Sequence, residues 1–349
     1  MSALVSISTR RDPEALRAHE IRTLPVVVLY PHNQCNCRCM MCDIWRIREA
    51  KQISERDVEQ LLPMFREFGV RWVVFSGGEP QLNERWSWIA QMLRAAGSRV
   101  TLLTAGLLLK AQAQAVADSV DDVIISLDGP PAVHNTIRRV PDAFERIAEG
   151  VKALHAMRPT LEIRARCTVQ KANHHSLRGV AAYARQMGLT SVSFLAADLT
   201  SEAFNRPEGW PADQRTRVAL TSAEIDELEA EVEKLIIEQT GDVPRFVAEG
   251  PDKLRRIVKH FRAHIGLARD IAPRCNAPWV SAVIEAGGDV RPCFFHPALG
   301  NIHHQPLNDI LNGPAALEFR SNLDVSTNET CRRCVCSLHL SNPDEVSYR

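Results

Sequence analysis

Six short stretches of the chain are rich in apolar residues and are separated by longer segments, and the first of them, Val26–Tyr30, is continuously apolar. Runs of this length are typical of strands that are buried on both faces of a parallel sheet. The predicted strands are Val26–Tyr30, Trp72–Ser76, Val100–Thr104, Asp122–Leu127, Leu161–Val169 and Ser191–Ala196.

The segments between these runs have the apolar periodicity of helices. Ser54 is a favourable N-cap, and the helix after it places the apolar residues between Val58 and Phe65 on one face. Pro63 lies inside this pattern, and we expect it to kink the helix or end it early. Further helices are predicted at Trp86–Ala96, Ala111–Ser119, Asp142–Met157 and Ser176–Met187, with a short one at Pro13–Glu20.

Strands that alternate with helices of this length predict an α/β fold, a parallel sheet built from βα units. Six units are too few to close an eight-stranded barrel. In such sheets the loops after the strands gather at the carboxyl edge, so we expect the working residues there.

The pattern changes after the sixth strand. Asp198–Thr221 is rich in polar residues and is expected to form a loop over the mouth of the strand–helix domain, where Trp210 and Phe204 either cover a substrate or pin the loop. Thr221 and Glu224 form a capping box that opens a helix. The C-terminal part adds a β-hairpin within Trp279–Phe295 and a helix near Leu307–Arg320.

Composition narrows the classes of function. The 349-residue chain has 42 basic and 42 acidic residues, so its net charge is zero, which argues against a nucleic-acid or membrane-surface partner. No apolar run approaches the ~20 residues of a membrane helix, and the polar N-terminus does not resemble a signal peptide. Ten cysteines in such a chain indicate metal binding in a reducing cytoplasm.

Three cysteines follow the first predicted strand with the spacing Cys35-x3-Cys39-x2-Cys42. Soft thiolates are the preferred ligands of iron–sulfur clusters, and three of them hold three corners of a cubane. The fourth iron then keeps open positions that bind a small molecule. A zinc knuckle, or a four-cysteine cluster that includes Cys37, remains an alternative for this loop.

The CxxxCxxC spacing, followed by Gly77-Gly78-Glu79-Pro80 at the end of the second strand, resembles the radical S-adenosylmethionine (radical SAM) enzymes. The resemblance implies an open, six-stranded partial (β/α)6 barrel over about residues 22–200. It also implies a [4Fe–4S] cluster that chelates SAM, breaks its C–S bond on reduction and yields a 5′-deoxyadenosyl radical.

The resemblance further assigns cofactor-binding residues at the ends of strands. It places Gly77, Gly78, Glu79 and Pro80 near the amino group of SAM, and Ser126 and Asp128 near SAM, its ribose or the substrate. Arg164 and Arg166 share one face of the fifth strand, where each needs an anionic partner. That partner is either the carboxylate of SAM or a structural salt bridge. Thr104-Ala105-Gly106 lacks the asparagine that relatives often show there.

The C-terminal part holds five more cysteines. Cys275 and Cys293 flank the predicted hairpin, and Cys331-x2-Cys334 forms a CxxC turn followed by Cys336. Four such ligands can converge on one metal site. The number of ligands fits a zinc ion as well as an iron–sulfur cluster.

The same segment, about residues 270–336, resembles the SPASM and twitch auxiliary-cluster domains of radical SAM enzymes. A full SPASM domain needs seven cysteines, so the resemblance implies a twitch-like domain with one auxiliary [4Fe–4S] cluster on Cys275, Cys293, Cys331 and Cys334. Cys336 either replaces Cys334 or takes no part, and Cys37 and Cys167 are expected to be bystanders. We expect four regions: a lead-in over 1–24, the barrel over 25–200, loop and helices over 201–268, and the auxiliary domain over 269–349.

The functional hypothesis is hydrogen abstraction from a substrate, followed by its oxidation through the auxiliary cluster, because a cluster on four thiolates has no open site. A small, sugar- or aminocyclitol-like substrate is favoured on the resemblance to twitch dehydrogenases. Modification of a ribosomally made peptide is the alternative, and a non-enzymatic electron carrier is a remote one. A reducing partner such as flavodoxin or ferredoxin is implied, with neither nucleic acid nor membrane.

Overall fold

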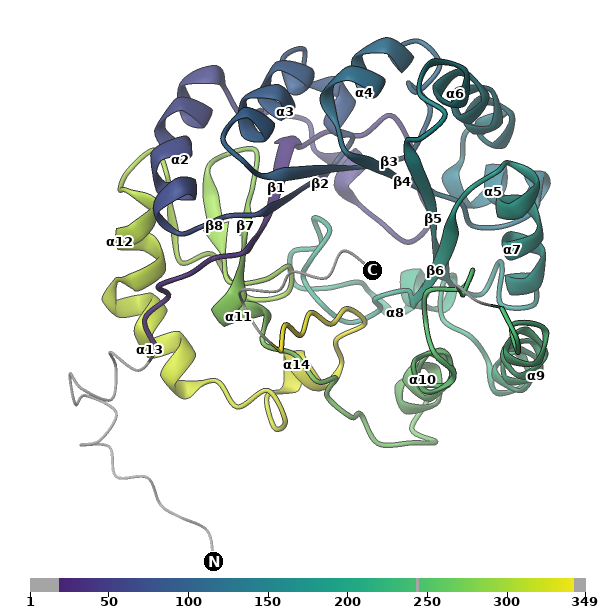
Figure 1. Cartoon of the computed structure of the whole chain (residues 1–349). Coiled ribbons are helices and arrows are strands. Elements are labelled where there is room, and N and C mark those ends of the chain that lie inside the picture. Colours follow the sequence, from purple (N-terminus) through teal and green to yellow (C-terminus); the bar gives the residue numbers. More distant parts are fainter. Residues whose placement is uncertain (1–18, 243–244, 342–349) are drawn as a thin grey trace, which may run out of the picture.

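The computed structural model describes residues 19–242 and 245–341, and within them nine strands form one sheet in the order β6-β5-β4-β3-β2-β1-β7-β8-β9. The strands are β1 Val26–His32, β2 Trp72–Gly77, β3 Arg99–Thr104, β4 Asp122–Ser126, β5 Glu162–Val169, β6 Ser191–Ala196, β7 Ser281–Ile284, β8 Asp289–Arg291 and β9 Gly300–Asn301. Strands β1 to β6 pair in parallel with their sequence neighbours. They form a curved, open barrel wall (Figure 1).

The six predicted strands are confirmed, with small shifts at their ends. Their residues alternate between two environments. In β5, for example, Ile163, Ala165, Cys167 and Val169 are fully buried, whereas the residues between them are half-buried or exposed. The buried set packs under the helices, and the other set faces the hollow of the barrel, as the pleat of a strand requires.

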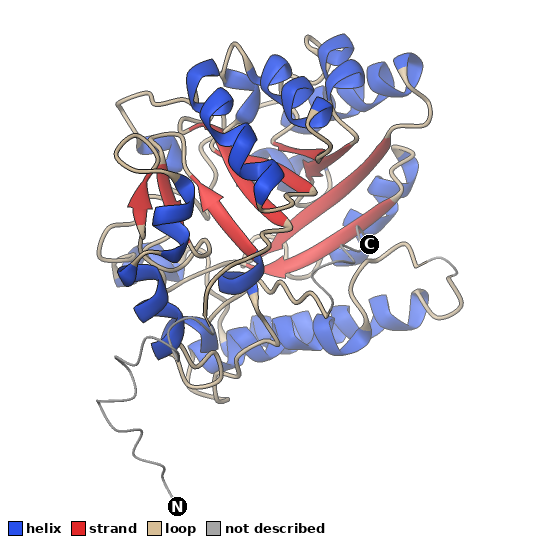
Figure 2. Ribbon diagram, turned by 60° about the vertical axis from the view of Figure 1, so that its left-hand side comes forward, coloured by secondary structure: helices blue, strands red, loops and turns tan. Residues whose placement is uncertain are grey.

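The helices are α2 Glu55–Glu67, α3 Trp86–Ala95, α4 Ala113–Ser119, α5 Pro131–Arg138, α6 Ala143–Met157, α7 Leu177–Gln186, α8 Ala212–Thr216, α9 Ser222–Glu238, α10 Pro251–His264, α11 Ala277–Val280, α12 Leu307–Asn312, α13 Pro314–Asn322 and α14 Glu329–Arg332. Helices α2 to α7 lie along the convex side of the sheet, whereas α8, α11 and α14 lie on its open side (Figure 1), and Figure 2 shows the helices and strands from another direction. Short 3₁₀ turns occur at η2 Ile44–Arg46 and η3 Pro80–Leu82.

Local sequence rules explain several of these boundaries and fail at others. Ser54 caps α2 and Thr221 caps α9, each in a capping box with the residue three positions on. Helix α2 does not end at Pro63 but runs on to Glu67. Pro63 and Glu59 are both exposed, so the carbonyl that loses its helical partner at Pro63 faces water.

Of three further expectations, two need correction and one concerns residues that the structure mostly does not describe. The helix expected near Leu307–Arg320 is two helices, because Gly313 and Pro314 end α12 and begin α13. Helix α5, in the stretch after β4, was not predicted, and α8 interrupts the loop expected over Asp198–Thr221. The short helix expected at Pro13–Glu20 lies, except for its last two residues, outside the described residues.

The C-terminal hairpin continues the sheet of the barrel. Strands β7 and β8 pair in antiparallel fashion as expected, while β7 also pairs in parallel with β1. The hairpin therefore extends the barrel wall beyond β1, and the segment after it crosses the open side of the barrel (Figure 1). The boundaries proposed for the four regions stay a prediction.

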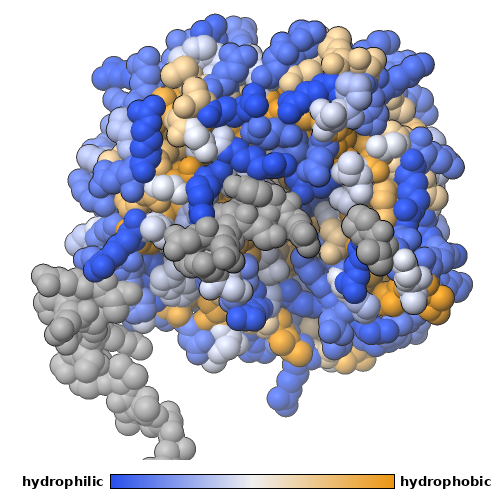
Figure 3. All heavy atoms as spheres, in the orientation of Figure 1, coloured by the Kyte–Doolittle hydropathy of each residue, from blue (hydrophilic) through white to orange (hydrophobic). Residues whose placement is uncertain are grey.

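The face seen in Figure 3 is mostly hydrophilic, with scattered hydrophobic residues. Among the described residues, no helix combines the length and the apolar character needed to cross a bilayer.

Asn83 ties three segments of the barrel mouth together. Its amide nitrogen donates to the carbonyls of Pro31 and Ile53 at 2.9 Å each, and its Oδ1 accepts from the Arg85 amide at 2.8 Å. The side chain is fully buried. The residue therefore fixes the end of β1, just before the cysteine loop, against the segment that follows β2.

We expect Asn83→Ala to lower the free energy of unfolding by about 2–3 kcal/mol, because it leaves the Ile53 carbonyl without its side-chain donor and the Arg85 amide without its acceptor, while the Pro31 carbonyl keeps the Ile53 amide. Urea denaturation of the apoprotein measures the change. Glu84→Ala is the control, since Glu84 is exposed and adjacent, and it should change stability by less than about 0.5 kcal/mol. Equal effects of the two substitutions would contradict this role of Asn83.

Candidate functional site

The loop that carries Cys35, Cys39 and Cys42 begins directly after β1, at the carboxyl edge of the parallel strands. Backbone hydrogen bonds dock it on the end of α5, from the Arg38 amide to the Arg138 carbonyl (3.1 Å) and from the Met40 amide to the Ile137 carbonyl (3.0 Å). Cys39 is buried, while Cys35 and Cys42 are half-buried. The three thiols therefore lie in a loop that is held from a distant part of the chain.

The thiols of this loop influence one another strongly. A hydrogen bond from the Cys37 thiol, together with the nearby Arg138 cation, lowers the pKa of Cys39 to about 6 despite its burial. The pKa of Cys37 is raised, because its thiol donates to Cys35 and Cys39 and is buried. Burial and the charge of Cys39 raise the pKa of Cys42 to about 12. The Cys37 thiol and the Arg138 cation thus both favour the thiolate form of Cys39.

A glycine turn packs against the start of the cysteine loop. Gly77 ends β2 with a φ of +97°, and a Cβ on it would lie 2.6 Å from the Tyr30 ring. A Cβ on Gly78 would lie 2.0 Å from the Gln34 carbonyl oxygen, and the Glu79 amide donates to that same oxygen at 2.8 Å. Only glycine allows this approach. Pro80 follows as the first residue of η3.

Glu79 is fully buried and points into the adjacent turn after β3. Its carboxylate accepts from the Thr104 hydroxyl (2.9 Å), the Ala105 amide (2.8 Å) and the Gln81 amide (3.2 Å). Burial raises its pKa to about 7, although these donors oppose the rise. The Thr104-Ala105-Gly106 turn therefore binds Glu79 through the Thr104 hydroxyl and the Ala105 backbone amide.

Asp128 is fully buried, and both of its carboxylate oxygens are engaged. Oδ2 accepts from the Arg138 guanidinium at 2.6 Å, and Oδ1 accepts from the Thr168 amide at 3.0 Å. Arg138 is itself buried, and its Nη1 donates to Cys39 Sγ at 3.5 Å. Sequence reasoning missed Arg138, although a buried Asp128 requires a cation and the helix after it supplies one.

The other predicted SAM-binding residues lie in two environments. Arg164 forms an ion pair with Asp122 at the amino end of β4. This pair is the structural salt bridge considered above as the alternative to binding the carboxylate of SAM. Ser126, at the end of β4, and Arg166 lie opposite each other on neighbouring strands. Arg166 is exposed to the barrel hollow and donates to Ser193 Oγ at 3.2 Å.

Residues 198–210, which follow β6 and are called the strap below, hold the cysteine loop in place. Trp210 is buried, and its Nε1 donates to Asp43 Oδ2 at 2.5 Å. Arg206, whose guanidinium lies 3.6 Å from the Trp210 ring centroid, pairs with Asp198 and donates to the Met41 carbonyl. These contacts show that Trp210 pins its loop to the cysteine loop, which is one of the two roles considered for it. The side chain of Phe204 lines the cavity described next.

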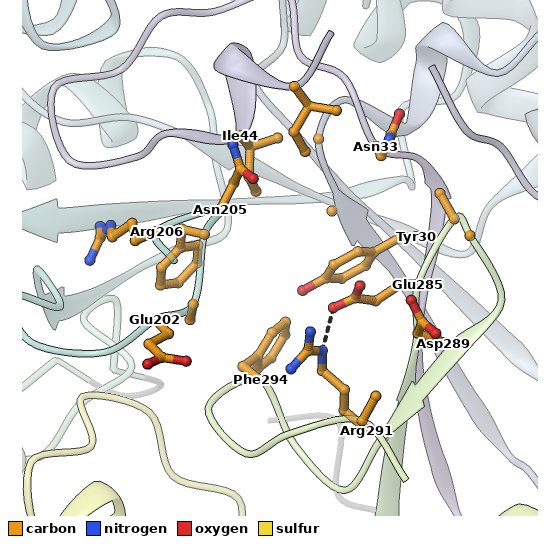
Figure 4. Close-up of a pocket in the computed structure, with 18 of the residues that line it drawn as sticks. Tyr30, Asn33, Ile44, Glu202, Asn205, Arg206, Glu285, Asp289, Arg291 and Phe294 are labelled. Atoms are coloured by element: carbon orange, nitrogen blue, oxygen red, sulfur yellow. Dashed lines mark hydrogen bonds and ion pairs between the residues drawn. The ribbon is translucent and has the colours of Figure 1, made fainter. Parts of the chain in front are cut away.

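A cavity of about 660 Å³ opens at the barrel mouth between the glycine turn, the cysteine loop, the strap and the C-terminal hairpin. Figure 4 shows Tyr30 and Phe294 at its centre, with the ion pair between Glu285 and Arg291 beside them and Glu202 across from them. Its size is typical of small-molecule sites. Of the predicted cofactor-binding residues, Gly77 and Gly78 line this cavity, and Arg166 lines the inner cavity described next.

The five C-terminal cysteines line a second cavity, of about 220 Å³, inside the barrel. Its wall also contains apolar strand residues such as Val28, Val74 and Leu103. Burial, together with neighbouring thiolates, raises the pKa of Cys293 to about 11 and that of Cys331 to about 12. Phe294, Phe295 and His296 line both cavities, so they separate the mouth from the inner space.

The donor sets fit iron–sulfur clusters. In residues 19–242 and 245–341, no three His, Cys, Asp or Glu side chains converge as ligands of a single ion would. A tetrahedral zinc site brings all its ligands to one ion, whereas each thiolate of a cubane binds a different iron. Three thiols in the N-terminal loop and five around the inner cavity offer the soft donors that iron–sulfur clusters prefer, and both Cys334 and Cys336 lie at the inner cavity.

Comparison with known proteins agrees with this geometry. The Radical SAM superfamily model matches residues 29–165, and the SPASM model, described as an iron–sulfur cluster-binding domain, matches residues 275–335. Fe-coproporphyrin III synthase of Methanosarcina barkeri is 22% identical over 352 residues, covering 93% of this chain and 85% of that protein. The antilisterial bacteriocin subtilosin biosynthesis protein AlbA of Bacillus subtilis is 24% identical over 318 residues, covering 87% and 63%.

The fold is also found among solved structures. Streptococcus suis SuiB bound to its precursor peptide SuiA superposes with a TM-score of 0.67 at 15% sequence identity, covering 95% of this chain and 76% of that one. At this identity the likeness concerns the fold. It supports the partial barrel with a C-terminal extension as the architecture of the chain.

We expect the reconstituted protein to bind about eight irons, four per cubane. Cys35→Ala, Cys39→Ala and Cys42→Ala should each abolish 5′-deoxyadenosine formation, and the triple variant should keep about four irons. Cys37→Ala should remain active, and Cys167→Ala, on β5, is the matched buried control. Iron analysis and chromatography of the products measure both effects. Normal SAM cleavage by Cys39→Ala would contradict the assignment.

Glu79 should make SAM binding depend on pH. Because its pKa is raised to about 7, the carboxylate forms as the pH rises, and affinity for SAM should increase between about pH 6 and about pH 8. Glu79→Gln should weaken binding at the higher pH by about 1.5–3 kcal/mol and flatten the profile. Equilibrium titration with SAM measures this, with the exposed Glu84→Gln as control. An unchanged profile in Glu79→Gln would show that Glu79 does not contact SAM.

Proposed function

Because this chain carries a radical SAM domain followed by a SPASM iron–sulfur domain, we propose that it is an oxidoreductase that removes hydrogen from a small polar substrate. When bound, SAM and the N-terminal cluster supply a 5′-deoxyadenosyl radical, which takes a hydrogen atom from an unactivated C–H bond. The observation that carries the proposal is the mouth cavity, which the glycine turn, the cysteine loop and the C-terminal hairpin share.

The residues at the mouth have different proposed roles in binding the cluster and SAM. Cys35, Cys39 and Cys42 hold three irons and leave one open for SAM. Gly77 and Gly78 bring the backbone close to the ligand, and Glu79 offers a carboxylate to its amino group. Ser126, Asp128 and Arg166 remain in the proposed set, whereas the ion pair of Arg164 with Asp122 supports the structural alternative for Arg164.

A net oxidation follows from the second set of cysteines. A cluster held by Cys275, Cys293, Cys331 and Cys334 has no open iron, so its chemistry is electron transfer. Phe294, which follows Cys293 directly, lines both cavities. The proposed substrate site and the proposed electron acceptor are thus separated by a few side chains, which supports transfer of the substrate's electron to that cluster.

The size and polarity of the mouth cavity support a small substrate. Its lining includes Asn33, Lys51, Glu202 and Asp289, which offer donors and acceptors to a hydroxylated or aminated molecule. SAM takes part of the 660 Å³, so the remaining volume suits a sugar- or aminocyclitol-sized substrate. The similarity to a protein named for the synthesis of Fe-coproporphyrin III also favours small-molecule chemistry.

Peptide modification is the second candidate. One relative is named for bacteriocin biosynthesis, and one structure of the same fold was solved with a precursor peptide. The mouth cavity is open to solvent, so one side chain of a bound peptide would also fit there.

The redox setting is part of the proposal. All ten cysteines are free of disulfides, which agrees with a reducing cytoplasm. Reduction of the N-terminal cluster requires an electron donor such as flavodoxin or ferredoxin.

Transfer of hydrogen from the substrate provides the test. The reduced enzyme is incubated with unlabelled SAM and an extract of cells grown in deuterated medium, after the extract is separated into low-molecular-mass and peptide fractions. We expect deuterium in 5′-deoxyadenosine with the low-molecular-mass fraction, because the radical abstracts the label directly. Mass spectrometry detects it, and Cys39→Ala is the control.

The outcomes separate the candidates. Label that arises only with the peptide fraction favours the maturase and overturns the small-substrate proposal. Absence of label with both fractions, despite unlabelled 5′-deoxyadenosine formation, would contradict hydrogen abstraction from either class.

A further inference from the structure

A buried cation lies against one of the three cysteines of the N-terminal loop. Arg138, the last residue of α5, is 8% exposed, and its Nη1 lies 3.5 Å from Cys39 Sγ. These two residues are 99 positions apart in the chain. Neither the proposed binding of SAM nor the proposed oxidation gives this guanidinium a role.

Asp128 orients the guanidinium. Nε and Nη2 of Arg138 both lie 2.6 Å from Asp128 Oδ2, which leaves Nη1 to face the thiol. The other carboxylate oxygen accepts from the Thr168 amide, and the Asp128 amide donates to His134 Nδ1. Asp128 is thereby fixed from β5 and from α5, and Arg138 has little freedom to turn away.

The backbone of the same helix end holds the loop on both sides of Cys39. The Arg38 amide donates to the Arg138 carbonyl, and the Met40 amide donates to the Ile137 carbonyl. One short segment thus positions the backbone around Cys39 and also places a positive charge on its sulfur. A purely structural partner of Asp128 would not need either contact.

We propose that Arg138 is a positioning residue that seats the Cys39 thiolate for the N-terminal cluster and raises the reduction potential of that cluster, with Asp128 partly offsetting its charge. This inference rests on the proposed function, because it requires a cluster on Cys35, Cys39 and Cys42. Reduction adds a negative charge to the cluster, and a cation in a low-dielectric surrounding favours the more negative state. Charge and hydrogen bonds to the sulfurs are among the factors that set cluster potentials.

The sign of the change distinguishes this role from a structural one. Arg138→Gln removes the cation, so it should lower the equilibrium constant for one-electron reduction about tenfold, which corresponds to about 59 mV. Asp128→Asn leaves the cation without its counter-charge, so it should shift the potential in the opposite direction. Arg138→Lys keeps the charge and should stay closer to wild type than Arg138→Gln does.

Redox titration of the full-length, reconstituted protein, followed by electron paramagnetic resonance, measures these shifts. The signal that changes when SAM is added belongs to the cluster with an open iron, so it reports on the N-terminal site alone. Iron content and circular dichroism of each variant accompany the titration. Arg139→Gln is the matched control, because Arg139 is the next residue and is exposed.

Each outcome bears on the inference. Opposite shifts in Arg138→Gln and Asp128→Asn, with Arg139→Gln unchanged, support it. If Arg138→Gln folds but loses about four irons while Arg138→Lys keeps them, the seating of Cys39 is supported. Equal potentials in all variants, or shifts of one sign in both, overturn it. If the wild-type protein has no SAM-responsive signal, the proposed function fails instead.

Discussion

The close approach of two backbone segments at the carboxyl edge of the sheet is the constraint on which the mouth of this barrel depends. Gly78 lies so near the Gln34 carbonyl that any side chain there would overlap it. The Glu79 amide donates to that same carbonyl, and Cys35 is the next residue after Gln34. The glycine turn and the first thiol are therefore fixed by one contact, since a shift in either segment breaks the hydrogen bond.

Burial then decides how the charges around this contact are arranged. Three ionisable groups buried near the mouth have partners: Glu79 from the turn after β3, Asp128 from α5, and Arg206 from Asp198 in its own segment and from a backbone carbonyl of the cysteine loop. A buried charge without a partner is costly, so these contacts fix the loops relative to one another. Two arginines, Arg138 and Arg206, end on the cysteine loop. The loop is thus held by two guanidinium groups whose charges are balanced by Asp128 and Asp198.

The parts of the fold with local causes were predictable from sequence. The six strands are predictable because each has a run or an alternation of apolar residues that is buried under the helices, and the cysteine motif is predictable because its spacing is local. The sequence pattern predicts one C-terminal helix where the structure has two, because the apolar positions continue across Gly313 and Pro314. Arg138 was missed because its importance arises from a contact with Cys39, far away in the chain. Such pairs leave no periodic signal in a single sequence.

The two cavities differ in polarity. The mouth is open and carries charged side chains, whereas the inner cavity is lined mainly by apolar residues and cysteines. Between them, Tyr30 stacks on Phe294 at 6.2 Å between ring centroids, and Phe295 packs edge-on against Phe294 and Phe204. Aromatic rings exclude water without adding charge. This partition therefore lets the mouth exchange polar ligands with solvent while the inner thiols stay in an apolar surrounding, a separation that a single open barrel would not provide.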